Sequence, residues 1–97
     1  MSGDSNLVGG KNYTSDGAGA LGRWRDAEVG VWTCDPGVYP DTEADEVFVV
    51  LEGAATVEFV APALPAIEIG PGSVVRLEEG MRTVWTVREA LRKVYLS

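Results

Sequence analysis

EVFVVLEG, at residues 46–53, predicts a strand that is apolar on both of its faces. Side chains alternate along a strand, so the apolar ones form two sets: Val47, Val49 and Leu51 on one face, and Phe48 and Val50 on the other. A strand with one face in water carries polar residues on that face. We therefore expect one face to meet a barrel interior and the other a second sheet or a second subunit, and we favour a homodimer.

Similar short runs rich in Val, Thr, Ile and aromatic residues extend from Trp24 to the end of the chain, separated by turn signals. About eight strands are expected, among them 28–34, 46–52, 55–60, 67–69, 73–77, 83–88 and 91–96. Residues 88–93 are also compatible with a helix, but β-branched and aromatic neighbours favour two strands joined near Glu89-Ala90. Many short antiparallel strands in one small chain predict an all-β sandwich or small barrel.

The first 22 residues differ in composition from the rest of the 97-residue chain. They hold six of the twelve glycines and show no apolar periodicity. Such a segment buries too little apolar surface to offset the entropy lost on ordering it. We expect residues 1–22 to form a flexible N-terminal arm and residues 23–97 to form one domain. The alternative is that Leu7-Val8 or Tyr13 docks on a partner subunit as an edge strand.

The composition excludes several classes of function. The chain has no histidine, which rules out a Ser-His-Asp triad, an imidazole base and a histidine-ligated metal within it. Its single cysteine, Cys34, excludes an internal disulfide and is expected to be a small core residue, since nothing nearby would activate it. The net charge is −7, and ten acidic residues but no basic one lie between Asp26 and Val75. This charge argues against nucleic acid or an anionic membrane as a partner.

The sequence also bears on location. No apolar stretch approaches the ~18 residues that a membrane span needs. The N-terminus lacks the basic start and apolar run of a signal peptide, and a single cysteine fits a reducing compartment. We therefore expect a cytoplasmic protein with no membrane partner.

Two spaced motifs resemble those of the cupin superfamily. The first motif of that family has a glutamate and a glycine with six residues between them, as Glu46 and Gly53 have here, although Gly37 lies too close to serve as its opening glycine. The second motif is similar to the spacing from Gly72 to Gly80. Three phrases, at 32–37, 45–47 and 91–95, look closest to the ureidoglycine aminohydrolase-like and ethanolamine-utilisation-type single cupins.

The resemblance covers residues 24–96 and implies a double-stranded β-helix, or jelly-roll, barrel of bacterial type. It also implies frequent dimers and a ligand pocket in the mouth of the barrel. The histidines that hold a metal in other cupins would fall on Pro40, Thr42 and Thr83, so we expect no metal site of the family type. An alternative divalent site for Mg²⁺, Mn²⁺ or Ca²⁺ would use oxygen ligands. Its ligands would be Glu46 with Asp41, Glu43 or Asp45.

Glu46 is the central candidate residue. The resemblance points its side chain into the barrel, where a carboxylate needs a partner, water or a proton. It is then either a general acid or base, or a structural group that pairs with Arg82 or Tyr39. We list Glu46 as a candidate catalytic residue with both roles open.

Aromatic residues complete the expected site. By strand alternation Phe48 lies on the face of Glu46, and Trp85 on the face of Thr83. Aromatic walls around one acid suit a small amphipathic or cationic organic molecule, although simple core packing is the alternative. The expected ligand-binding residues are Trp32, Tyr39, Phe48, Thr83 and Trp85.

The sequence is compatible with three functions. The first is metal-free binding of a small molecule in the barrel. The second is an aminohydrolase-, isomerase- or lyase-like enzyme that uses Glu46, or a carboxylate-held metal. The third is an interaction module whose acidic surface docks another protein.

Overall fold

The chain folds entirely into antiparallel strands in the part that the computed structural model describes, which is residues 4–5, 8–9, 11–12 and 16–97, with side chains from Gly22 onward. Among these residues there is no helix long and apolar enough to cross a membrane. The strands are β1 (Asp4–Ser5), β2 (Val8–Gly9), β3 (Lys11–Asn12), β4 (Asp16–Trp24), β5 (Ala27–Cys34), β6 (Gly37–Thr42), β7 (Glu46–Ala61), β8 (Leu64–Ile69), β9 (Val74–Leu77) and β10 (Arg82–Leu96).

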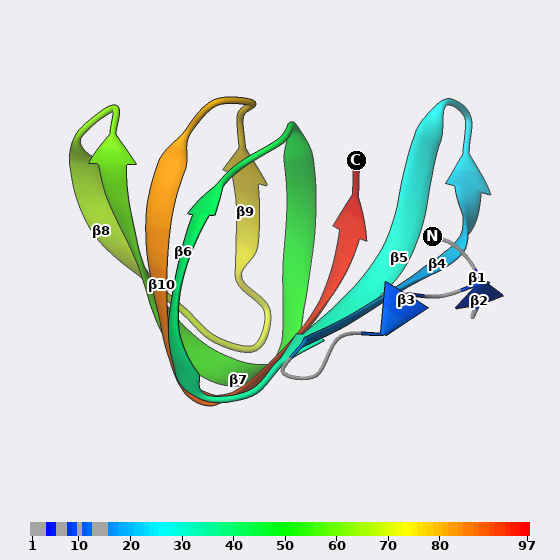
Figure 1. Ribbon diagram of the computed structural model, residues 1–97, viewed down its shortest axis with the longest axis horizontal. Coiled ribbons are helices and arrows are strands. Elements are labelled where there is room, and N and C mark those ends of the chain that lie inside the picture. The colour runs from blue at the N-terminus through cyan, green and yellow to red at the C-terminus, as the bar shows by residue number, and fades with distance from the viewer. Residues whose placement is uncertain (1–3, 6–7, 10, 13–15) are drawn as a thin grey trace.

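Two long strands, β7 and β10, run through both walls of the barrel (Figure 1). The first half of each strand pairs with the last half of the other. The order of strands across the sheet is β3-β4-β5-β10-β7-β8. One wall adds β6 and β8, while the other adds β4, β5 and β9. The structure thus confirms an all-β fold and fits the expected jelly-roll barrel.

The bend in both long strands occurs where they cross. Gly53 of β7 has a φ of +101°, and a Cβ built there would lie 2.3 Å from the carbonyl oxygen of Ala90 in β10. The β10 register shifts on both sides of Glu89 at the same place. The sequence prediction placed separate strands before and after Gly53, and again before and after Glu89-Ala90. Both predictions were wrong, since each pair forms one continuous strand. The chain bends there and keeps pairing instead of turning back.

Two further elements differ from the sequence prediction. β6 was not predicted, since its sequence carries a proline and few β-branched residues. β4 crosses the predicted boundary between residues 22 and 23, and it pairs with β5 along most of its length. The flexibility of residues 1–22 stays a prediction, while Leu7 and Tyr13 lie outside the described residues.

The barrel core is made of side chains that point inward from every long strand. Phe48 and Val50 are 1% exposed, so they lie on the interior face of β7 as the alternation predicted. Cys34, at the end of β5, is also buried in the core, in agreement with its expected role as a small core residue. The buried apolar set is Cys34, Phe48, Val50, Ala55, Val57, Ile69, Leu77, Trp85, Val87 and Leu91.

The outer face of β7 is apolar and open. Val47, Val49 and Leu51 are 42%, 37% and 45% exposed, so no second sheet of the described chain covers them, and that alternative was wrong. The neighbouring strands continue the face in register, since Val49 lies opposite Val74 of β9 and Val94 of β10.

We expect Gly53→Ala to lower the free energy of unfolding by about 3 kcal/mol or more, because the new Cβ meets the Ala90 backbone and φ is positive. Gly80→Ala is the matched control: it has a similar φ of +90° but open space around its Cβ. It should cost about 1 kcal/mol. Urea unfolding followed by tryptophan fluorescence measures both, and equal losses would contradict the crossing constraint.

Candidate functional site

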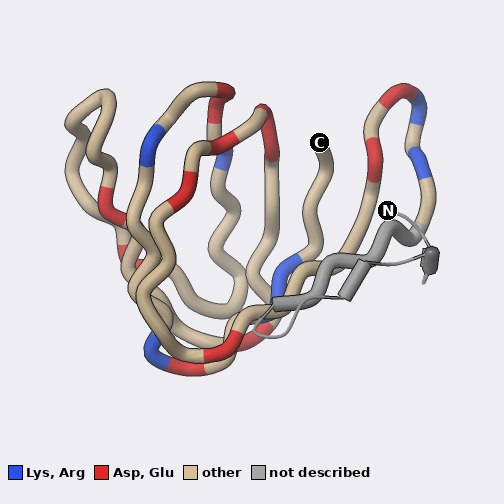
Figure 2. Tube along the Cα trace, in the orientation of Figure 1, with Lys and Arg blue, Asp and Glu red and all other residues tan. Residues whose placement is uncertain are grey.

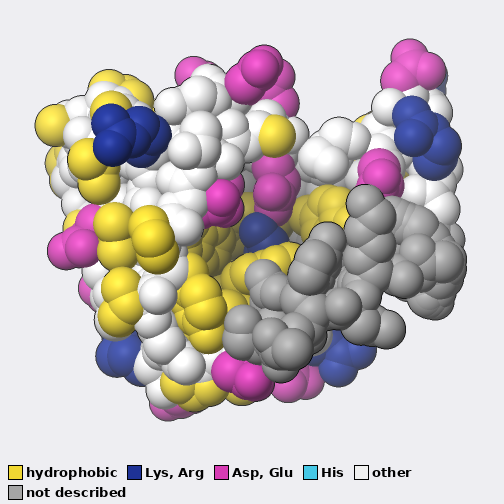
Figure 3. All heavy atoms as spheres, in the orientation of Figure 1, with side chains coloured by type: hydrophobic (Ala, Val, Ile, Leu, Met, Phe, Trp, Pro, Cys, Tyr) yellow, Lys and Arg dark blue, Asp and Glu magenta, His cyan; other side chains and the backbone are white. Residues whose placement is uncertain are grey.

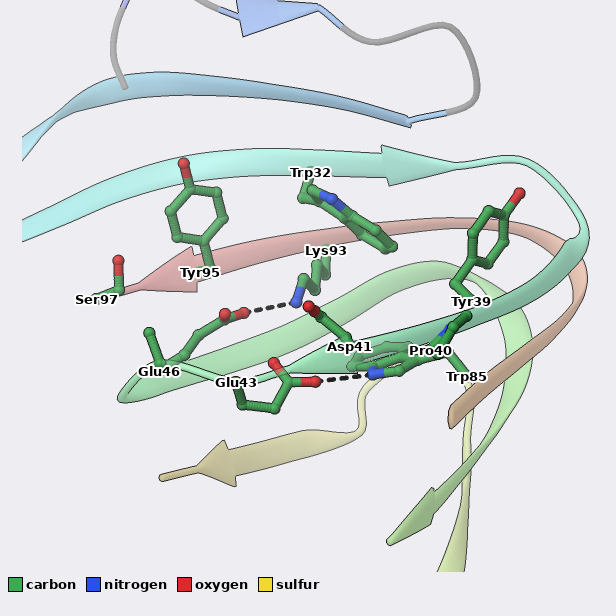
Figure 4. Close-up of a pocket in the computed structure, with 11 residues that line it drawn as sticks. Trp32, Tyr39, Pro40, Asp41, Glu43, Glu46, Trp85, Lys93, Tyr95 and Ser97 are labelled. Carbon is green, nitrogen blue, oxygen red and sulfur yellow. Dashed lines mark hydrogen bonds and ion pairs between the residues drawn. The ribbon is translucent and has the colours of Figure 1, made fainter. Parts of the chain in front are cut away.

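A cavity of about 330 Å³ opens at the mouth of the barrel, between its two walls (Figures 3 and 4). It is lined by three carboxylates, four aromatic side chains and one lysine. These are Asp41, Glu43, Glu46, Trp32, Tyr39, Trp85, Tyr95 and Lys93. Acidic residues gather where β6 gives way to β7, and at the neighbouring connection from β9 to β10 (Figure 2).

The structure brings four of the six predicted site residues to this cavity: Glu46, Trp32, Tyr39 and Trp85. Phe48 lies behind the wall, 1% exposed, with its ring centroid 5.6 Å from that of Trp85. Thr83 is 2% exposed and lines a second, more open hollow of about 480 Å³ instead. Phe48 and Thr83 therefore support the cavity without lining it.

Glu46 begins β7 and pairs with Lys93 of β10. The Lys93 ammonium donates to Oε2 of Glu46 over 2.5 Å, and the two side chains are only 7% and 16% exposed. The predicted partners Arg82 and Tyr39 were wrong. The Tyr39 hydroxyl donates to the backbone oxygen of Asp35. Arg82 is exposed at the start of β10.

Lys93 is the residue that sequence reasoning missed. Its ammonium lies 4.1 Å from the centre of the Phe48 ring, 4.8 Å from Trp32 and 5.0 Å from Trp85. Aromatic faces attract a cation and offset part of the cost of removing it from water. The signal was present: Lys93 alternates with the buried Leu91, which places it on the interior face of β10.

Glu43 is a second buried carboxylate, at 7% exposure. Its Oε2 accepts hydrogen bonds from the Thr83 hydroxyl at 2.6 Å and the Trp85 indole N–H at 3.0 Å. Its backbone is held by bonds with Met81 and Gly80. From the sequence, Glu43 was expected only as a possible metal ligand, because nothing local distinguishes it from its solvated neighbours.

Asp41 lies near the end of β6, on the cavity wall. Burial raises the pKa of its carboxyl above the ordinary value, and the nearby charges of Glu43 and Glu46 act in the same direction. The ammonium of Lys93 opposes this shift of the Asp41 pKa without cancelling it. In Figure 4 the Asp41 carboxylate points toward Lys93 across the cavity.

Residues 21–95 match the family model described as the EutQ-like cupin domain. The chain belongs to this cupin family. The match spans β7, all of β10 except Leu96, and every described residue that lines the cavity except Ser97. No curated protein matches the chain.

Several solved structures share the fold of this cupin. A protein of unknown function from Acidithiobacillus ferrooxidans has a TM-score of 0.77 and 19% identity, covering 91% of this chain and 85% of its own. The EutQ protein of Clostridium difficile has a TM-score of 0.69 and 14% identity, and the match covers 84% of this chain and 65% of the EutQ chain. Ectoine synthase from P. lautus has a TM-score of 0.75 and 17% identity, and the match covers 90% of this chain and 66% of the synthase chain. At these identities the likeness establishes the fold alone.

The residues at the family's metal positions do not fit a histidine-type site. Pro40 has no donor atom in its side chain, and the Thr83 hydroxyl is committed to Glu43. Glu46 faces an ammonium, with its Oε2 on Lys93. We therefore derive no step through a metal ion.

The alternative site with oxygen ligands also lacks a coherent set of ligands. Asp45 accepts a hydrogen bond from the backbone N–H of Glu79 at 2.9 Å, which ties two loops together. In the described part of the chain, no three His, Cys, Asp or Glu side chains are grouped to hold a metal ion.

We expect Lys93→Met to lower the free energy of unfolding by about 3 kcal/mol, because it leaves the mostly buried Glu46 carboxylate without its partner. Adding Glu46→Gln to the same variant should recover part of this loss, since no unpaired charge then remains. Urea unfolding of both single variants and the double variant measures the coupling.

Arg88→Met is the control for this cycle. It removes an ion pair with Glu68 whose side chains are 48% and 68% exposed, so the urea midpoint should stay close to that of the wild type. A loss for Lys93→Met no larger than that for Arg88→Met would show that the interior pair is not structurally important.

Proposed function

We propose that this cupin domain binds a small amphipathic organic molecule with a cationic group, held in the barrel cavity without a histidine-ligated metal. One observation carries the proposal: among the described residues, Asp41, Glu43 and Glu46 line the same cavity as aromatic walls, against a single basic side chain, Lys93. Carboxylates pair with an ammonium group, and aromatic faces hold both its charge and an apolar body. A volume of about 330 Å³ suits a small ligand.

Two tryptophans supply the aromatic surface. The ring centroids of Trp32 and Trp85 are 5.9 Å apart, and their planes are tilted by 57°. Trp85 is fixed by its hydrogen bond to Glu43 and its contact with Phe48. A wall fixed in this way requires little ordering when a ligand arrives, which favours binding.

Acid or base catalysis at Glu46 is the rival hypothesis. Its Oε2 is already held by Lys93 at 2.5 Å, so proton transfer to a substrate would first require that pair to open. Asp41, with its raised pKa, is the better placed proton donor in the cavity. The third hypothesis, an acidic docking module, has no comparable geometric support.

Binding of butylamine, used as a simple ammonium probe, should strengthen as the pH rises through the raised pKa of Asp41. Deprotonation creates the carboxylate that attracts the ammonium group, so affinity is lost on the acid side. Titrations followed by tryptophan fluorescence, to which Trp32 and Trp85 contribute, measure this change between pH values of about 4 and 8.

The variant Asp41→Asn should bind butylamine more weakly at neutral pH and should show a flatter pH profile. Asp26→Asn, at the turn between β4 and β5, is the matched control and should behave like the wild type. An unchanged profile in Asp41→Asn would remove Asp41 from the site, and absence of butylamine binding at any pH would refute the cationic ligand.

We also propose that two copies of the chain associate through the outer face of β7. Val47, Val49 and Leu51 form an exposed apolar surface that neighbouring strands extend, with Val74 68% exposed beside Val49. Arg76 of the outer strand β9 lies opposite Val47, beside this apolar surface. In a two-fold dimer the same apolar surface of each copy would pack against the other. Apolar residues that adjoin in this way differ from the single scattered ones normal on a monomer surface.

Light scattering should give a mass near 21 kDa for the wild type, about twice the 10.3 kDa of one chain. Val49→Lys should give the monomer mass, because it places a charge within the shared face. Val60→Lys, at a 51% exposed position in the other half of β7, should leave the dimer intact. A wild-type mass near 10 kDa at micromolar concentration would refute the dimer.

A further inference from the structure

The ammonium of Lys93 has unused hydrogen-bonding capacity at the cavity. An ammonium group carries three N–H donors, and Lys93 donates to Oε2 of Glu46. Within residues 22–97 no other acceptor lies at hydrogen-bonding distance from it, although its side chain is 93% buried. The aromatic rings around it attract its charge but offer no oxygen atom. Lys93 therefore presents donors to whatever occupies the cavity.

Acceptors with unused capacity lie on the same cavity. Both hydrogen bonds to the Glu43 side chain go to Oε2, which leaves Oε1 without a partner among the described side chains. The carboxylate of Asp41 adds a second acceptor group on the wall formed by β6. In Figure 4 the Lys93 ammonium from β10, the Asp41 carboxylate from β6 and the Glu43 carboxylate from the connection between β6 and β7 converge on the cavity.

We infer that the ligand is of the amino acid class: a carboxylate that accepts from Lys93, joined by a short apolar body to an amine that donates to Asp41 and Glu43. The inference rests on the proposed function and adds a second pole to its cationic ligand. A ligand with an amine alone would leave the Lys93 donors desolvated without an acceptor, and it would bring a second positive charge near the first. A zwitterion satisfies both sets of groups.

The size and charge of the site agree with this class of ligand. About 330 Å³ accommodates an amino acid with a short side chain but is small for a peptide or a nucleotide. Glu46 and Lys93 already neutralise one another, so Asp41 and Glu43 carry the charge left on the wall. The ligand amine pairs with that charge, while its carboxylate meets the ammonium group of Lys93.

Four matched probes test the inference on the wild-type protein by calorimetric titration at pH 7.5. These are 2-aminobutanoate, 4-aminobutanoate, butylamine, which lacks the carboxylate, and butanoate, which lacks the amine. At least one of the two amino acids should bind about tenfold more tightly than butylamine, the gain expected from an additional charge-assisted hydrogen bond. Butanoate should bind more weakly than either amino acid.

The double variant Lys93→Met/Glu46→Gln removes the donor without leaving an unpaired carboxylate. It should lose the tenfold advantage of the amino acid over butylamine, with both probes measured on the same variant. Arg92→Met, the adjacent exposed basic residue on β10, is the matched control and should keep the advantage. Near-ultraviolet circular dichroism checks that the tryptophan environment of each variant remains folded.

A second measurement does not depend on any variant. The chain has only two lysines, Lys11 and Lys93, so protein labelled with ¹³C at the lysine ε-carbon gives two assignable signals. The Lys93 signal should move when the better amino acid is added and should move less with butylamine.

The outcomes separate the inference from the function on which it rests. If butylamine binds as tightly as both amino acids, or if the double variant keeps the advantage, the zwitterion is refuted and the cationic ligand stands. If the Lys93 signal does not move on amino acid binding, the assignment of the carboxylate to Lys93 is refuted. If no probe binds, or if butanoate binds most tightly, both the inference and the proposed function fail.

Discussion

The close approach of Gly53 to the backbone of Ala90 is the constraint on which the barrel depends. Because no side chain separates β7 from β10 there, both strands can bend at one point and continue pairing beyond it. Each long strand thereby contributes to both walls, and the cavity is the space that the two walls leave at their open end. The positions of the functional groups follow from this crossing, since Trp85 precedes it and Lys93 follows it along β10.

The electrostatics of the site follow from placing one ammonium among several carboxylates in an aromatic setting. Low local polarity strengthens both the attraction between Lys93 and Glu46 and the penalty for any charge left unpaired. The same surroundings raise the pKa of Asp41, which lies near two other acids. The cavity thus combines the ion pair of Lys93 and Glu46 with the carboxyl group of Asp41, whose pKa is raised.

Strand alternation predicted the inward set of β7 and the inward positions of Thr83 and Trp85, because a period of two residues is a local property of the chain. The glycine spacings likewise predicted the cupin barrel. Lys93 was missed because charged residues are usually solvated, and only the fold places three aromatic rings around it. The partner of Glu46 could not be predicted either, since it lies 47 residues away and depends on the crossing. β4 and β6 were missed because pairing with their neighbours, rather than their own composition, makes them strands.

The geometry of β10 also limits how this chain can vary during evolution. Thr83, Trp85, Leu91 and Lys93 are all buried, so the offset in residue number between the two pairs across the bend must be even. Substitutions at Arg88, Glu89 or Ala90 leave that parity unchanged. Insertion or deletion of one residue there would exchange Lys93 for a neighbour that faces solvent, and the ammonium and its aromatic surroundings would be lost in one step. Length changes in this lineage therefore belong in the turns between strands, such as the one at Gly70–Gly72, and not within β10.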